Sequence, residues 1–235
     1  MRWGQDFSHR SSQPELMDTE TVTYEEFDTC LRHLAFINRC TLAYRPTLQW
    51  LKRQLANSSK PVTILDIGCG GGDMLRRIWN KFQGNPITLI GVDMNPWSQK
   101  SAQSQTTVGA PITYNTCNVF SFEEDKRVDY IISSLFAHHL NDAELVNFMR
   151  WSDRHATLGW FINDLHRHPL PWLVIRYAVC RRPFHRFIRH DAPVSVARAF
   201  TRADWQRLLR QAGIPPERTA IRWHFPFRYG VERWL

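Results

Sequence analysis

The chain has 235 residues, of which 43% are apolar and 13% aromatic, so it can bury a sizeable core and is expected to form a folded domain rather than a disordered polypeptide. A formal net charge of +8 indicates an acidic partner, such as a nucleic acid, an anionic lipid or an acidic small molecule. The five cysteines are scattered, which disfavours a disulfide framework and a structural zinc site, predicts no metal, and favours a cytoplasmic protein.

The N-terminal region divides into a tail and two helices. Residues 1–18 are polar and are expected to be a disordered tail, and the folded domain is expected over residues 19–235. Thr23 and Glu26 have the spacing of a capping box, which predicts the start of the first helix. Pro46 is expected to open a second helix, and a Ser-rich linker ends this region near residue 58.

Residues 62–73, with the sequence Val-Thr-Ile-Leu-Asp-Ile-Gly-Cys-Gly-Gly-Gly-Asp, carry the most informative pattern in the chain. The β-branched apolar run predicts a buried parallel strand, the glycines predict a tight turn, and the apolar spacing after residue 73 predicts a helix. Glycines permit positive φ and let a ligand lie against the backbone, at the N-terminus of the new helix. The sequence therefore predicts a ligand site at this turn.

Strands and helices then alternate along the chain. We expect further strands over 87–93, 112–119, 128–134 and 158–163, and helices over 98–105 and 141–151. A helix after Thr201 and two closing strands, 218–225 and 227–235, complete the pattern. This order predicts an α/β fold with a doubly wound, mostly parallel, seven-stranded Rossmann-like sheet, which binds ligands at the carboxyl ends of its strands.

Residues 165–190 differ in composition from the rest of the chain. They contain no Asp or Glu, six Arg, and four of the ten His, interspersed with aromatic and aliphatic residues. An aromatic and basic amphipathic stretch suits an interface, a lipid-like substrate or an anionic ligand. A peripheral membrane contact through this stretch is one expectation.

The spacing of the residues in the glycine turn restricts the class of ligand that the turn can bind. A dinucleotide fingerprint that starts at Gly68 would need a third glycine at position 73, where the chain has Asp73, and the Lys of a P-loop is absent. Carboxylates on both sides of the turn, from Asp66 and Asp73, would repel a pyrophosphate. They suit a ligand with a cationic or donor-rich end.

Four segments together resemble class I S-adenosylmethionine-dependent methyltransferases: Leu65–Asp73, Gly91-Val-Asp-Met94, Cys117-Asn-Val119 and Asp129–Leu135. The resemblance implies that S-adenosylmethionine is the cofactor and that its methionine part lies on Gly68, Gly70 and Gly72, with Asp66 near its amino group and Ser134 near its methionine end. It also implies that Asp93 accepts the ribose hydroxyls, and that Met94, Asn118 and Val119 surround the adenine. Asn118 departs from the usual Asp, but an amide oxygen can accept the same bond.

Histidines mark the acceptor side. His138 and His139 follow the fourth strand, and Asp164 leaves the fifth strand at the same edge of the sheet. A histidine at this edge could deprotonate a phenol near neutral pH. We expect His139 to be the catalytic base, with His138 and Asp164 as alternatives, and His166 as a further competitor.

The resemblance implies a small-molecule methyltransferase similar to ubiquinone/menaquinone and polyketide or phenolic-lipid methyltransferases. Residues 19–58 and a helical insertion over 165–200 would then form a lid over a hydrophobic acceptor, with O-methylation of a phenolic, quinone-like or polyketide-derived aromatic in secondary metabolism as the expected reaction. At the end of the fourth strand the chain has Ser-Ser-Leu-Phe instead of the Asn-Pro-Pro-Tyr or Asp-Pro-Pro-Tyr motif of adenine or glutamine methylases, so a nucleic acid is not the expected partner. RNA methylation and non-catalytic cofactor binding are the alternatives.

Overall fold

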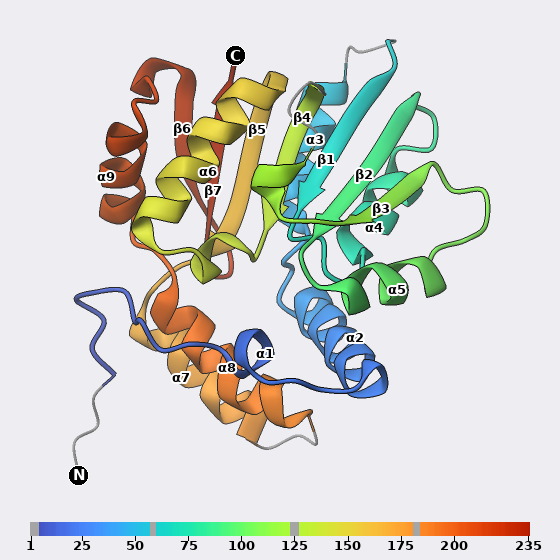
Figure 1. Ribbon diagram of the computed structural model, residues 1–235. Coiled ribbons are helices and arrows are strands. Elements are labelled where there is room, and N and C mark those ends of the chain that lie inside the picture. The colour runs from blue at the N-terminus through green and yellow to red at the C-terminus, as the bar shows by residue number, and fades with distance from the viewer. Residues whose placement is uncertain (1–4, 57–59, 123–126, 181–183) are drawn as a thin grey trace.

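The structure, a computed structural model, describes residues 5–56, 60–122, 127–180 and 184–235. One sheet has the strand order β3-β2-β1-β4-β5-β7-β6, and β7 runs antiparallel to both of its neighbours (Figure 1). The strands are β1 Val62–Ile67, β2 Ile87–Asp93, β3 Ile112–Thr116, β4 Val128–Ser134, β5 Ala156–Leu165, β6 Thr219–His224 and β7 Arg228–Trp234. The predicted seven-stranded, mostly parallel α/β sheet is confirmed.

Helices cover both faces of this sheet and its carboxyl edge. The α-helices are α1 Leu16–Thr19, α2 Tyr24–Cys40, α3 Arg45–Leu55, α4 Asp73–Lys81, α5 Pro96–Ser104, α6 Asp142–His155, α7 Pro169–Cys180, α8 Arg186–Arg198 and α9 Arg202–Ala212. Three short 3-10 helices are η1 Val119–Ser121, η2 Ala137–His139 and η3 Pro216–Arg218. None of the described helices is both long and apolar enough to cross a bilayer.

Two hydrophobic cores hold the layers together, one on each face of the sheet. On one face, α6 and α9 bury Phe148 and Trp205 against strand residues such as Trp160. On the other face, Trp50 of α3 stacks on Phe161 of β5 with ring centroids 5.1 Å apart. Because both faces are covered, the strands are apolar along most of their length, as the sequence of a buried parallel sheet requires.

A third group of helices lies beyond the carboxyl ends of the strands. Helices α1, α2, α7 and α8 lie together below the sheet in Figure 1. Cys30 of α2 and Phe187 and Ile188 of α8 are buried at the centre of this group. The group therefore comes from two distant parts of the chain and faces the edge at which ligands bind in such sheets.

The N-terminal tail corrects one expectation from the sequence. Residues 1–4 lie outside the described residues, but residues 5–18 pack on the molecule instead of forming a disordered tail. Ser11 N donates to Ala197 O at 3.0 Å, and Arg10 Nε donates to Arg198 O at 2.8 Å. The segment is polar because backbone carbonyls at the end of α8, and not an apolar core, provide its partners.

The third strand is shorter than the sequence predicts. It ends at Thr116 instead of residue 119, because the Asn118 side chain accepts from Phe120 N at 3.0 Å and begins η1. An Asn at this position competes with the sheet for backbone hydrogen bonds, so it ends the strand. Val119 consequently lies in a 3-10 turn beyond the carboxyl end of β3.

Candidate active site

The turn between β1 and α4 is built on left-handed glycines. Gly68, Gly70 and Gly72 have φ values of 70°, 49° and 71°. A Cβ at Gly68 would lie 2.6 Å from the Phe136 ring, and a Cβ at Gly72 would overlap the Tyr114 hydroxyl. The turn therefore needs glycine both for its backbone and for the close approach of its neighbours.

Asp93 joins the end of β2 to this turn. Its Oδ2 accepts from Gly70 N and its Oδ1 accepts from Asn95 N, both at 2.9 Å. The parallel register pairs Ile67 with Val92, so the side chain of the next residue in β2 reaches the turn that follows β1. Burial raises the pKa of Asp93, against the opposing effect of these backbone N–H groups.

Three carboxylates surround the turn. Asp66 is 2% exposed, and its burial, together with the charges of Asp73 and Asp93, raises its pKa well above the usual value. A cluster of this kind disfavours phosphate and favours a ligand that brings positive charge. The sulfonium and ammonium groups of S-adenosylmethionine fit this donor set.

His138 and Asp164 form a buried pair at the carboxyl edge of β4 and β5. His138 Nδ1 lies 2.8 Å from Asp164 Oδ1, and His138 N donates to Asp164 Oδ2 at 3.0 Å. Burial alone would raise the pKa of Asp164, but the His138 imidazole and the N–H groups of Leu165 and His138 lower it. The carboxylate therefore fixes the orientation of the imidazole, and its Nε2 points away from the sheet.

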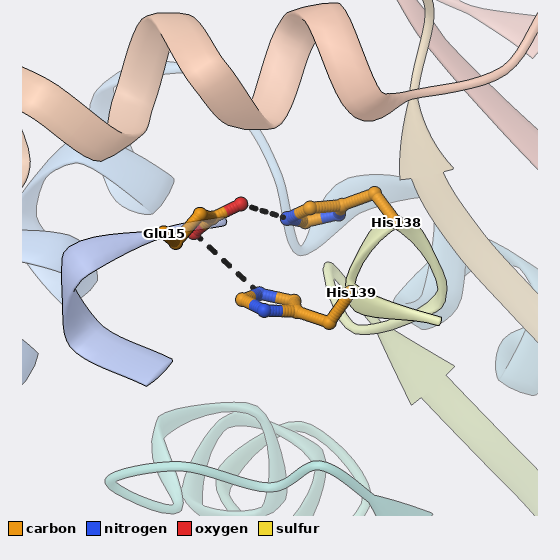
Figure 2. A group of neighbouring side chains, drawn as sticks. All are labelled: Glu15, His138 and His139. Carbon is orange, nitrogen blue, oxygen red and sulfur yellow. Dashed lines mark ion pairs between the residues drawn. The ribbon is translucent and has the colours of Figure 1, made fainter. Parts of the chain in front are cut away.

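His139 is held by the N-terminal segment. Its Nδ1 lies 2.8 Å from Asp18 Oδ2, and its Nε2 lies 3.7 Å from Glu15 Oε2. His138 Nε2 approaches the other oxygen of Glu15, so the carboxylate lies between the two imidazoles (Figure 2). Although burial lowers the pKa of His139, Asp18 and Glu15 raise it to about 9. Without any further ligand His139 is protonated at neutral pH, which disfavours its expected role as a base.

The two parts of the site are neighbours. Phe136, which precedes η2, covers Gly68, and the charge of His139 is among the effects that oppose the rise in the pKa of Asp93 on burial. The edge with the imidazoles thus borders the glycine turn. A ligand on the turn would have its reactive end near η2.

Residues 64–159 match a family model described as a methyltransferase domain. The magnesium protoporphyrin IX methyltransferase from Synechocystis PCC 6803 with bound SAH is 15% identical, with a TM-score of 0.57, over 92% of this chain and 88% of that chain. The plantazolicin methyltransferase in complex with SAH is 14% identical, with a TM-score of 0.65, over 89% and 95%. A SAM-dependent methyltransferase from Aquifex aeolicus is 14% identical, with a TM-score of 0.60, over 91% and 99%. No curated protein matches the chain significantly. Residues 64–159 are thus similar to a methyltransferase domain, and the chain has the fold of these S-adenosylmethionine-dependent methyltransferases.

The structural neighbours hold S-adenosylmethionine or its product, and the positions of this chain that are expected to hold the same cofactor fall into two groups. Asp66, the three glycines and Asp93 meet at one turn. Met94 follows directly and is 73% exposed, as a residue that covers a ligand would be.

The remaining expected cofactor residues also have partners within the protein. Val119 is 8% exposed and belongs to the core under α6, and Asn118 caps η1. Ser134 Oγ lies 3.0 Å from Thr47 Oγ1 of α3, so its hydroxyl is already engaged at the end of β4.

Sequence reasoning missed the residues that cover the site. Leu31 of α2 lies over the glycine turn, 3.6 Å from a Cβ built at Gly70. Glu15 and Asp18 bind the histidines from a segment that was expected to be disordered. Their acidic residue types were visible in the sequence, but no local pattern connects them to residues more than a hundred positions away.

Proposed function

We propose that this protein transfers the methyl group of S-adenosylmethionine to a hydroxyl oxygen of a hydrophobic small molecule, of the phenolic, quinone-like or polyketide-derived aromatic class. The observation that supports this most strongly is the pair of carboxylate-held histidines beside the glycine turn. Imidazole groups at this edge would activate a hydroxyl group, which is a poor nucleophile until it loses its proton. An acceptor without an acidic proton would have no use for them.

The reaction balances as a displacement at the methyl carbon. The cofactor supplies a methyl group on a sulfonium. The hydroxyl loses its proton, an oxygen electron pair forms the new C–O bond, and the electrons of the C–S bond stay on sulfur, giving S-adenosylhomocysteine. In-line positioning supplies much of the rate. We assign the acceptance of the hydroxyl proton to His138, which Asp164 positions. His139, whose pKa is raised to about 9, would lie beside it as a charged hydrogen-bond donor.

On the donor side, we propose specific roles for the residues of the turn. Gly68, Gly70 and Gly72 would carry the methionine part, and Asp66 its amino group. Asp93 would accept from the ribose hydroxyls with the lone pairs that its two backbone bonds leave free. The adenine would contact Met94, Asn118 and Val119. The methionine end would lie near Ser134.

We propose that residues 19–58 and 165–200 form the cover of the acceptor site within a single domain, 19–235. Helices α2 and α8 meet over the carboxyl edge through an apolar contact that includes Phe187 and Ile188. Phe184 adds ring contacts to Phe36 and His33 of α2, with centroids 6.4 Å and 5.7 Å apart. A cover of this composition supports a hydrophobic acceptor. The names of two structural neighbours, which refer to a magnesium porphyrin and to plantazolicin, also support a small-molecule acceptor.

Helix α7 supports a peripheral membrane contact as a source of such an acceptor. Leu170, Leu173 and Val174 are 50%, 40% and 59% exposed on this helix. Arg176 stacks over the Trp172 ring at 5.0 Å, so a cation and an aromatic lie beside the exposed aliphatic side chains. This combination is typical of helices that lie in the headgroup region of anionic membranes.

The test is a methylation assay with labelled S-adenosylmethionine and three acceptor sets: aromatic phenols and hydroquinones, the matching aromatic amines, and total RNA. We expect label on the phenols. His138→Ala should lower the rate by about 100-fold or more with unchanged affinity for S-adenosylhomocysteine. His9→Ala, at an exposed histidine, is the control and should behave as wild type. Label on amines or RNA alone would contradict the proposal.

A further inference from the structure

Three side chains near the acceptor edge converge on one point. Glu15, His138 and His139 each offer one ligand atom, and these atoms lie within 4.8 Å of one another. The side chains come from the N-terminal segment and from η2, and Figure 2 shows both imidazoles directed at the same carboxylate. They form a group of the two-histidine, one-carboxylate type that holds transition metals.

The spacing within this group is wider than that of hydrogen bonds. His138 Nε2 lies 3.6 Å from Glu15 Oε1, and His139 Nε2 lies 3.7 Å from Glu15 Oε2. A hydrogen bond between such atoms would be about 2.7 to 3.2 Å long. Two ligand atoms that each lie about 2.0 to 2.2 Å from a common ion can be up to about 4.4 Å apart. The distances to the two Glu15 oxygens fall in this range, and the whole group lies within 4.8 Å, so small side-chain shifts would bring the ligand atoms to one ion.

Each imidazole is also bound at its Nδ1 atom by a second carboxylate. His138 Nδ1 is held by Asp164 and His139 Nδ1 by Asp18, each at 2.8 Å. A carboxylate can only accept, so it keeps the proton on Nδ1 and leaves the lone pair of a neutral ring on Nε2. Metal-binding histidines typically have such a carboxylate partner, which sets the tautomer and strengthens the ligand.

The third ligand is also held in place. Asp191 of α8 accepts from Leu16 N at 2.8 Å and from Met17 N at 3.0 Å, which fixes the backbone next to Glu15. Ser195 Oγ donates to Glu15 Oε1 at 2.9 Å, and the Glu15 residue is only 4% exposed. Its carboxylate therefore has one oriented position between the two imidazoles.

Charge and access support a cation at this point. Glu15, Asp18 and Asp164 place three carboxylates around the two imidazoles, whereas Arg198 donates to the backbone carbonyls of both histidines. Arg10 also donates to His138 O, at 3.4 Å, but it is paired with Asp142, so carboxylates still outnumber guanidinium groups around the imidazoles. The side chain of His139 is 26% exposed, so solvent reaches the group from its side.

We propose that Glu15, His138 Nε2 and His139 Nε2 bind one divalent transition-metal ion of the zinc type, with a coordination position left for an oxygen of the acceptor. The role of the ion rests on the proposed function: with both Nε2 atoms bound to it, the ion takes the place of a histidine base. The acceptor hydroxyl would bind to the ion, which lowers the pKa of that hydroxyl, and the proton would leave to solvent past His139. Three protein ligands and one open position are the arrangement of catalytic zinc sites. Imidazole ligands select this class of ion over magnesium or calcium.

The test is calorimetric titration of the purified chain with Zn²⁺, supported by metal analysis after dialysis. We expect one ion per chain in the wild type. Glu15→Gln and His139→Ala each remove a ligand and should weaken binding by about 100-fold or more, and Asp164→Asn, which changes only the support of His138, by about 10-fold to 100-fold. His190→Ala is the matched control, because Asp191 also holds its Nδ1, at 2.7 Å, while its Nε2 faces Gln13. This variant should bind Zn²⁺ as the wild type does.

Two results would overturn the proposal. One is a wild type that binds no Zn²⁺, and the other is binding that Glu15→Gln, His139→Ala and His190→Ala weaken equally. Affinity for S-adenosylhomocysteine, measured in parallel, shows that each variant is folded. The titration contains no acceptor, so it stands apart from the methylation assay: Zn²⁺ binding without phenol methylation would refute the proposed acceptor and leave the metal site intact.

Discussion

Asp93 and Asp129 offer a test that separates cofactor binding from stability. Both carboxylates accept a backbone N–H in the sheet. Asp93 binds Gly70 N at the carboxyl edge, and Asp129 binds Thr63 N at 2.8 Å at the opposite edge. The substitutions Asp93→Asn and Asp129→Asn remove the same charge at opposite ends of β2 and β4, the two strands that flank β1. We expect Asp93→Asn to lose cofactor affinity with little change in stability, and Asp129→Asn to lose stability with little change in affinity.

The magnitudes follow from the contacts. A hydrogen bond to a charged acceptor is worth about 1.5 to 3 kcal/mol, and an amide at position 93 keeps one acceptor oxygen for two ribose hydroxyls. We expect a loss of about 2 kcal/mol of binding free energy, or about 30-fold in affinity. The raised pKa of Asp93 means that its charge disfavours the folded state at neutral pH. Removing that charge should therefore change the free energy of unfolding by about 1 kcal/mol or less.

The assay is calorimetry with S-adenosylhomocysteine together with urea unfolding of the free protein. Asp129→Asn should lose about 1.5 kcal/mol of stability, since its amide keeps only one acceptor oxygen for the two donors Thr63 N and Thr157 Oγ1, and it should keep wild-type affinity. The reasoning is refuted if Asp93→Asn binds as tightly as wild type. It is equally refuted if both variants lose affinity to the same extent.

Three further predictions concern the turn, an acid transition and α7. Gly68→Ala should lower the free energy of unfolding by about 2 kcal/mol or more, because its φ is 70° and the new Cβ would meet Phe136. Gly109→Ala has a φ of 85° but no atom within 4 Å of the new Cβ, so it should lose only about 1 kcal/mol. Urea unfolding measures both losses. Burial lowers the pKa of His166 to about 4 in the folded protein. As the pH falls, the unfolded chain therefore binds a proton at His166 before the folded protein does. The free energy of unfolding should fall by about 1 kcal/mol between pH 6.5 and 4, a value already reduced for the partial solvent exposure of His166. Val174→Glu should weaken sedimentation with anionic vesicles severalfold.

Each of these has a result that would count against it. Equal losses for the two glycine variants would show that the Phe136 contact is unimportant. A pH dependence that His166→Gln leaves unchanged would assign the acid transition to another group. Vesicle sedimentation that is identical for wild type and Val174→Glu would remove α7 from any membrane contact.

The donor side was predictable because its pattern is local. The strand, the glycine turn and Asp93 lie within about thirty residues, and parallel pairing of β1 with β2 brings them together without help from the rest of the chain. The seven strands follow from the same reasoning, since each is a short run of β-branched and aromatic residues between turn signals. The observed ends of the strands differ from the predicted ones where a side chain competes for backbone hydrogen bonds, as Asn118 does.

The acceptor side was only partly predictable. Residue types and strand ends placed His138, His139 and Asp164 at one edge, and the structure brings His138 to Asp164 directly. The partners of His139 could not be found in this way. Glu15 and Asp18 lie in a polar segment with no apolar periodicity, and their position depends on hydrogen bonds to α8 that no window of sequence contains.

The docking of the N-terminal segment also sets an order of assembly. The contact of Asp18 with His139 spans 121 positions and that of Glu15 with Ser195 spans 180, whereas β1, the glycine turn and β2 are contiguous. During synthesis, Glu15 emerges long before the groups that hold it, and loop closure over such separations is slow. A nascent chain would thus complete its donor pocket first and remain unable to process an acceptor until α8 has formed. Early occupancy by the donor would stabilise the half-made protein in that interval.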